Sequence, residues 1–125
     1  MNMLSKTTTL VIAVLLFAGS TAFAQTAIPK KDVKLKTYLI ERDIPNAGKL
    51  TPAELKGISQ KSCSVLKDMG PGIQWLQSYV TGNKIFCVYK AENEELIKEH
   101  GQKGGFPVTS ITEISSTISP ATAKK

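Results

Sequence analysis

The sequence is poor in the residues from which most metal centres and catalytic sites are built. Its 125 residues include one histidine, His100, and two cysteines, Cys63 and Cys87. No His-x-x-His, Cys-x-x-Cys or His-Glu-x-x-His spacing occurs, and there is no Gly-rich phosphate loop or nucleophile elbow. Local motifs therefore give no support for a metal centre or for a familiar class of enzyme.

The central part of the chain also lacks an excess of positive charge. The formal net charge is +6, but residues 25–36 contribute +3, and Lys124 and Lys125 add +2. Between Thr37 and Ser119, nine basic residues are balanced by nine acidic ones. A protein that binds nucleic acid needs basic side chains clustered on its folded surface. We therefore expect no nucleic-acid partner.

Long apolar runs are absent except near the N-terminus. Lys6 is followed by nine apolar residues, Leu10–Ala18, and then by the small-residue site Ala22-Phe23-Ala24. This pattern is typical of a Sec-type signal peptide. Nine residues are too few to span a bilayer, which needs about 20, so we expect no membrane anchor. Residues 1–24 are predicted to be removed by cleavage between Ala24 and Gln25, which leaves a periplasmic or secreted product.

The rest of the chain is long enough for one small domain with a single core. Residues 25–36 carry a proline and four lysines and are predicted to form a basic linker, and residues 120–125 a tail. Between them, the sequence predicts a strand at 38–44, a helix from 52, a hairpin at 73–91, a helix from 94 and a strand at 111–118. This βαββαβ order predicts a ferredoxin-like α+β domain over residues 37–119, with two helices on one face of a four-stranded antiparallel sheet.

Capping residues mark the start of both predicted helices. Thr51 and Glu54 have the spacing of a capping box, and Asn93 can cap the second helix. Gly101–Gly105 is predicted to end that helix, which places His100 in the last turn on its core-facing side. A histidine there is either a capping or packed core residue, or a ligand or proton-transfer group.

The predicted hairpin, Ile73–Ala91, has two chemically different faces if its strands alternate regularly. One face carries aromatic and polar side chains, Trp75, Gln77, Tyr79, Ile85, Cys87 and Tyr89; the other carries Leu76, Ser78, Val80, Phe86 and Val88. We expect the helices to cover the second face. Cys87 would then point away from them and could not form a disulfide with Cys63. The first face would form a ligand pocket or the interface of a homodimer.

The first strand divides its residues in a similar way. Tyr38, Ile40, Arg42 and Ile44 share one face, and Glu41 and Asp43 lie on the other. Two carboxylates on one strand face can bind a metal or act as acid and base. They can equally form a solvated edge or an interface salt bridge.

Three segments resemble a known family: ERDIPNAGKLTPAELKGISQKSC, GPGIQWLQSYVTGNKIFCVYKA and NEELIKEHGQKGGFP. They are similar to small ferredoxin-like proteins grouped as a domain of unknown function, some of which are named as nickel-binding proteins. The resemblance covers roughly Thr37 to Pro120. It implies a dimeric ferredoxin-like fold and a role for a transition metal, but no reaction.

One position departs from the family pattern, in which many members carry histidine where this chain has Gln77. Nickel(II) favours imidazole, and a carboxamide oxygen is a much poorer ligand. The remaining candidate ligands for nickel or another divalent transition metal are His100, Cys87, Glu41, Asp43 and Glu113. The candidate residues of a ligand pocket are Trp75, Gln77, Tyr79 and Tyr89.

Three functions remain open at this point. The first is an exported dimer that binds a divalent metal, or a small organic ligand, at or near its dimer-facing sheet. The second, suggested by fold analogy, is an enzyme with His100 as base, Tyr79 or Tyr89 as hydrogen-bond donor and Cys87 as nucleophile. The third is a structural dimer without a ligand. The sequence favours a binding protein.

Overall fold

The computed structural model describes residues 32–125. The predicted signal peptide and most of the predicted basic linker lie outside these residues. No helix within residues 32–125 is both long and apolar enough to cross a lipid bilayer.

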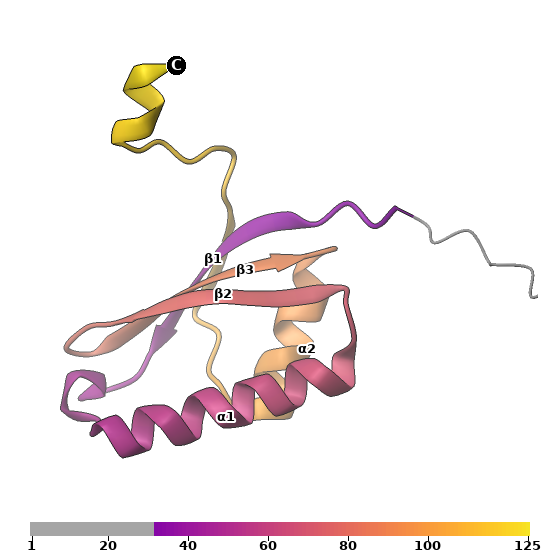
Figure 1. Ribbon diagram of the computed structural model, residues 1–125. Coiled ribbons are helices and arrows are strands. Elements are labelled where there is room, and N and C mark those ends of the chain that lie inside the picture. The colour runs from indigo at the N-terminus through magenta and orange to yellow at the C-terminus, as the bar shows by residue number, and fades with distance from the viewer. Residues whose placement is uncertain (1–31) are drawn as a thin grey trace, which may run out of the picture. The chain divides into compact units, whose positions relative to one another are not determined.

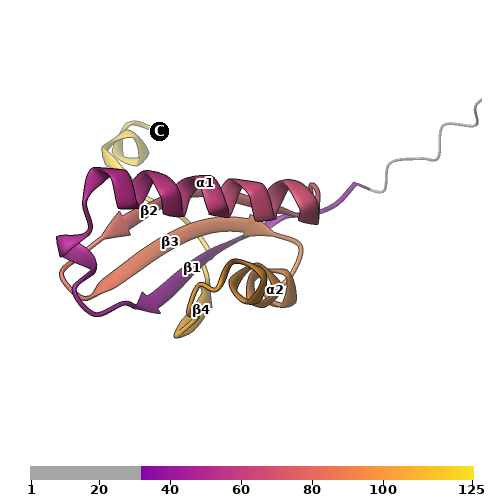
Figure 2. The ribbon, with the colours of Figure 1, turned by 90° about the horizontal axis from the view of Figure 1, so that it is seen from below.

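Strands and α-helices follow one another in the predicted order. The strands are β1 (Lys36–Asp43), β2 (Ile73–Val80), β3 (Lys84–Ala91) and β4 (Ser110–Glu113), and the helices are α1 (Pro52–Met69) and α2 (Glu94–Gly104). Short 3-10 helices occupy Ala47–Lys49 and, within the predicted tail, Pro120–Lys124. All neighbouring strands pair antiparallel in the order β2-β3-β1-β4. Both α-helices lie on one face of this sheet (Figures 1 and 2), which confirms the ferredoxin-like fold.

The predicted caps form at the start of both helices. Thr51 Oγ1 accepts the backbone N–H of Glu54 at 3.2 Å, and the Glu54 carboxylate accepts the Thr51 N–H at 2.7 Å. Asn93 Oδ1 accepts the backbone N–H of Leu96 at 3.1 Å. Each bond satisfies an N–H group that the first turn of a helix leaves without a partner.

Helix α2 is longer than the sequence predicts, because its glycines are needed for packing and do not end it. It continues through Gly101 and Gly104 to a cap at Gly105, where φ is 68°. A Cβ at Gly104 would clash with the ring of Phe106, so the close approach of that ring requires glycine. His100 therefore lies inside the helix, and its predicted place in the last turn is wrong.

Strand β4 is shorter than predicted. It pairs with β1 over Ser110–Glu113, and one further backbone bond joins the N–H of Ile114 to the carbonyl of Thr37. Ile118, which was predicted to belong to the strand, is 82% exposed. The register sets Ser115 opposite Lys36, the first residue of β1, so the β-branched residues further on lie beyond the end of their partner strand and their propensity alone does not extend β4.

The helices cover the face of β3 opposite to the one that the sequence predicts. Ile85, Cys87 and Tyr89 are 7%, 4% and 2% exposed, whereas Phe86 and Val88 are only half-buried. The buried residues share their face with the buried residues of β1, because the antiparallel register sets Tyr38 beside Tyr89, Ile40 beside Cys87 and Arg42 beside Ile85. The expectation that Cys87 points away from the helices is therefore wrong.

A β-bulge in β2 explains why regular alternation misassigns the other strand of the hairpin. Trp75 pairs with Tyr89, but Gln77 pairs with Val88, so β2 carries one extra residue at Leu76. Beyond the bulge the faces exchange. Ser78 and Val80 lie on the inner, helix-covered face with Trp75, and Gln77 and Tyr79 lie on the outer face of the sheet.

Candidate functional site

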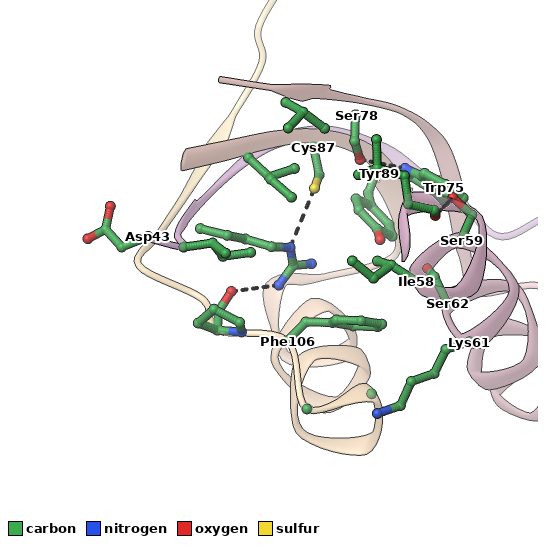
Figure 3. Close-up of a pocket in the computed structure, with 18 of the residues that line it drawn as sticks. Asp43, Ile58, Ser59, Lys61, Ser62, Trp75, Ser78, Cys87, Tyr89 and Phe106 are labelled. Carbon is green, nitrogen blue, oxygen red and sulfur yellow. Dashed lines mark hydrogen bonds between the residues drawn. The ribbon is translucent and has the colours of Figure 1, made fainter. Parts of the chain in front are cut away.

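A cavity of about 670 Å³ lies between the inner face of the sheet and helix α1 (Figure 3). The last residue of α2 and the segment after it, Gly104–Pro107, form a further wall. Most of the wall is apolar and includes Ile44, Leu55, Ile58, Trp75, Val80, Ile85 and Phe106. The polar and charged residues that line it are Arg42, Asp43, Ser59, Lys61, Ser62, Ser78, Cys87 and Tyr89. A volume of this size is typical of small-molecule sites, which span about 300–1,000 Å³.

The cavity exists because α1 presents small residues to the sheet. Five residues of α1 line it, and four of them, Leu55, Ile58, Ser59 and Ser62, have the spacing of one helix face; the fifth is Lys61. Two of the four are serines, and Ser62 is the one buried residue of this 18-residue helix. Ile58 remains 36% exposed although it belongs to the sheet-facing side. The helix therefore packs against the sheet without filling the space between them.

Arg42 is a buried charge within this wall. Strand β1 turns its side chain inward, where it is 3% exposed. Its Nε donates to the sulfur of Cys87 at 3.4 Å, and its Nη1 donates to the carbonyl of Pro107 at 2.8 Å. Its Nη2 is buried without a hydrogen-bond partner. Burial of a cation is costly unless it is paired, and among residues 32–125 no carboxylate forms an ion pair with Arg42.

His100 lies beside the cavity and is fully buried. Its Nε2 is 3.1 Å from Ser62 Oγ, and its Nδ1 has no hydrogen-bond partner within the described residues. The ring lies between those of Tyr89 and Phe106, with centroids 5.3 Å away on each side. Burial and, to a lesser extent, the charge of Arg42 lower its pKa to about 4. The imidazole is therefore neutral at physiological pH.

Two further polar groups of the cavity wall are the phenol of Tyr89 and the indole N–H of Trp75. Burial raises the pKa of Tyr89, so its phenol stays protonated and can donate a hydrogen bond. The Trp75 Nε1–H donates to Ser78 Oγ at 2.9 Å, which fixes the indole against the wall, as Figure 3 shows.

The structure divides the predicted pocket residues into two pairs. Trp75 and Tyr89 line the cavity. Gln77 and Tyr79 lie on the outer face, where the Gln77 amide donates to the hydroxyl of Tyr79, which is 56% exposed. The predicted set assumed an unbroken period of two, and the bulge at Leu76 breaks that period.

The predicted metal ligands are likewise divided between the two faces. Cys87 and His100 lie beneath the helices. Glu41 and Asp43 belong to the outer face and both interact with Lys84, whose Nζ is 3.5 Å from Asp43 Oδ1. The Asp43 carboxylate points away from the cavity (Figure 3). Glu113 interacts with Lys36 at 3.4 Å.

These residues do not fit a nickel centre within one chain. No group of three His, Cys, Asp or Glu side chains within residues 32–125 is placed to hold a metal ion. The sulfur of Cys87 accepts a bond from the Arg42 guanidinium, and a cation repels a second cation at this distance. His100 is held by Ser62 and has no bond to Cys87, so the nucleophile and base suggested by the sequence are not joined either.

Sequence reasoning missed three residues of the cavity wall, Arg42, Ser62 and Phe106. Two of them left a signal. Arg42 is a charged residue on the otherwise apolar face of β1, and Ser62 interrupts the apolar stripe of α1. Phe106 follows the helix in an irregular segment, and no pattern indicates that its ring would lie against His100.

The fold and the cavity together define a small ferredoxin-like domain with a ligand-sized site between its sheet and a helix. Residues 38–114 match the sequence model of a family described as nickel responsive proteins like SCO4226, and the chain belongs to this family. The family resemblance of the sequence is thereby confirmed. No curated protein matches the chain.

A solved structure shares the fold. The crystal structure of SCO4226 from Streptomyces coelicolor A3(2) superposes with a TM-score of 0.57 and 15% sequence identity. The alignment covers 66% of this chain and 99% of that one. At this level of identity the likeness extends to the fold and not to the site.

The low pKa of His100 predicts a pH-dependent stability. The unfolded chain binds a proton near pH 6.5 and the folded chain only near pH 4. The contribution of His100 to the free energy of unfolding is therefore complete above about pH 6.5. As the pH falls to 4 this contribution is lost, and the free energy of unfolding decreases by about 3 kcal/mol. Urea unfolding between pH 4 and pH 7.5, with EDTA present, should show a shallower pH dependence for His100→Gln than for the wild type. An equal pH dependence of stability in the two proteins would contradict the lowered pKa of His100.

Proposed function

We propose that the chain is a binding protein that holds a small organic molecule in the cavity between the sheet and α1. The observation that carries this proposal is the cavity itself, with its volume of about 670 Å³, apolar walls and converging polar groups. Sites with these properties are the usual sites of small ligands.

Nuclear magnetic resonance can test this proposal through Trp75, the only tryptophan in the chain. Titration with 3-phenylpropanamide, a neutral probe smaller than the cavity, should shift the indole N–H resonance with an affinity of roughly millimolar or better. Ser59→Phe fills the cavity from α1 and should abolish the shift. Ser64→Phe, on the exposed side of the same helix, should leave the shift unchanged. If neither this amide nor the carboxylate of the same shape, 3-phenylpropanoate, moves the indole resonance of the wild type, the proposal fails.

We further propose that two copies of the chain pair through the outer face of the sheet. Neither α-helix covers this face (Figures 1 and 2). It carries Leu39, Phe86 and Val88, which are half-buried, and Tyr79, which is exposed. A contiguous apolar surface of this kind on a small domain favours association, and an isologous homodimer is the commonest solution. Of the face that the sequence predicts for this seam, Gln77 and Tyr79 lie on the outer face, whereas Trp75, Ile85, Cys87 and Tyr89 lie on the inner one.

Sedimentation equilibrium can test the pairing. Phe86→Glu introduces a charge at the centre of the outer face and should convert a dimer into a monomer that is still folded. Ile118→Glu is the matched control, because Ile118 is exposed but lies outside the four strands. A wild-type protein that sediments as a monomer at all concentrations would refute the dimer.

The family match favours nickel as a second candidate ligand, for a site that two chains would share. Its donors would be Glu41 and Asp43 of both copies, since these carboxylates belong to the outer face. Cys87 and His100 are excluded from such a site by their position beneath the helices. Sedimentation with and without Ni²⁺ extends the experiment above. Stabilisation of the dimer by the metal, lost in Glu41→Gln, supports this candidate, and an unchanged equilibrium removes it.

We also propose that the protein acts outside the cytoplasm, in the periplasm or after secretion. The support is the order of Lys6, the apolar run Leu10–Ala18 and the Ala22-Phe23-Ala24 site in the sequence. The N-terminal sequence of the protein recovered from the cell exterior or periplasm should begin at Gln25. Recovery of the full chain from the cytoplasm would contradict export.

A further inference from the structure

The geometry points to a small monocarboxylate with an apolar or aromatic body as the ligand of the cavity, with its carboxylate bound by Arg42. This inference rests on the proposed binding function and names the chemical class of the ligand. It also separates this cavity from metal binding, because the same guanidinium that attracts an anion repels a divalent cation.

The first support is the unused hydrogen-bonding capacity of Arg42. A guanidinium carries five N–H donors in a fixed fork, and the structure uses two of them, on Cys87 and on the carbonyl of Pro107. Neither partner is a carboxylate, and Nη2 has no hydrogen-bond acceptor among the described residues. A carboxylate accepts two parallel N–H bonds from such a fork, with a geometry that few other small groups match.

The second support is the distribution of charge around the cavity. Glu41 and Asp43 flank Arg42 in the sequence, but strand alternation places both on the outer face, where Lys84 binds them. The other cation that lines the cavity is Lys61, whose Nζ is 5.8 Å from the centroid of the Phe106 ring. Asp43 also lines the cavity, but its carboxylate points away from it (Figure 3). The positive side chains of the cavity therefore face no inward-pointing carboxylate among the described residues, which favours the entry of an anion.

The third support is the apolar character of the remaining wall, which favours one carboxylate over a phosphate. Trp75, Ile58 and Phe106 offer surfaces for a hydrocarbon or aromatic body. The Tyr89 phenol can donate a further bond to the anionic end. An arginine fork can bind either group, but a phosphate would leave its remaining charged oxygens against this apolar wall, which is unfavourable, whereas a monocarboxylate is satisfied by the fork.

Binding requires a small movement at Phe106. The guanidinium carbon of Arg42 lies 5.7 Å from the centroid of this ring, and Nη2 is shielded from solvent. Phe106 is only half-buried, so its ring can turn toward solvent, at the cost of part of its contact with His100.

A matched pair of probes tests the inference in the wild-type protein. Calorimetry with 3-phenylpropanoate and 3-phenylpropanamide compares a carboxylate with a neutral group of the same shape. We expect the carboxylate to bind about tenfold more tightly or better, as a charge-assisted bond would give. If the amide binds as well as the carboxylate, the inference is overturned while the proposed binding function stands. If neither probe binds, both are overturned.

Two variants then locate the anion. Arg42→Gln should weaken binding of 3-phenylpropanoate by about tenfold or more and leave binding of the amide nearly unchanged. Lys56→Gln removes the same charge from an exposed residue of α1 that does not line the cavity and should change the affinity less than about threefold, since exposed charges are screened. The reverse order of effects would overturn the role of Arg42.

The experiment stays informative if Arg42→Gln proves unstable. Arg42→Lys keeps the charge but loses the planar fork, and should also lower the affinity for 3-phenylpropanoate. The comparison of the two probes in the wild type needs no variant at all. Addition of Ni²⁺ to the complex of the wild type with 3-phenylpropanoate should not displace the carboxylate. Displacement of the carboxylate by the metal would overturn the inference.

Discussion

The register between β1 and β3 is the constraint on which this structure depends. It sets Tyr38, Ile40 and Arg42 on the same face as Tyr89, Cys87 and Ile85, and the helices cover that face. Because side chains in a strand alternate with a period of two, a shift of one residue would exchange every buried side chain for an exposed one. The core, the wall of the cavity and the apolar outer face all follow from this single pairing.

The same constraint brings a charge into the interior. Arg42 cannot leave the inner face without moving its apolar neighbours on β1 out of the core, so its guanidinium is held beneath the helices, where Pro107 and Cys87 only partly satisfy it. A protein that needed only stability would place an apolar side chain there, because isolated buried charges are unfavourable. The serines of α1 that line the cavity, Ser59 and Ser62, leave space beside this charge. The cavity and its cation are thus parts of one arrangement.

Membership of a nickel-responsive family and the chemistry of this cavity point to different ligands. Imidazole and thiolate are strong ligands for nickel, and the chain has one of each beneath its helices, but the Arg42 side chain binds the thiol and Ser62 holds the imidazole. Carboxylates that could serve a metal lie on the opposite face. A fold can keep its architecture while its sites change, and the two faces of this sheet offer separate places for the two kinds of ligand.

The sequence by itself determined the order of elements, the helix caps at Thr51 and Asn93 and the ferredoxin-like topology, because capping groups and apolar periodicity act locally. It also placed Arg42 on the apolar face of β1. Only the tertiary structure decided which face of the hairpin the helices cover, since both faces carry enough apolar surface to be buried. The bulge at Leu76, which sends Gln77 and Tyr79 outward and Ser78 inward, depends on pairing with β3 and leaves no local signal. The extension of α2 past Gly101 likewise depends on Phe106, a contact that exists only after the chain has folded.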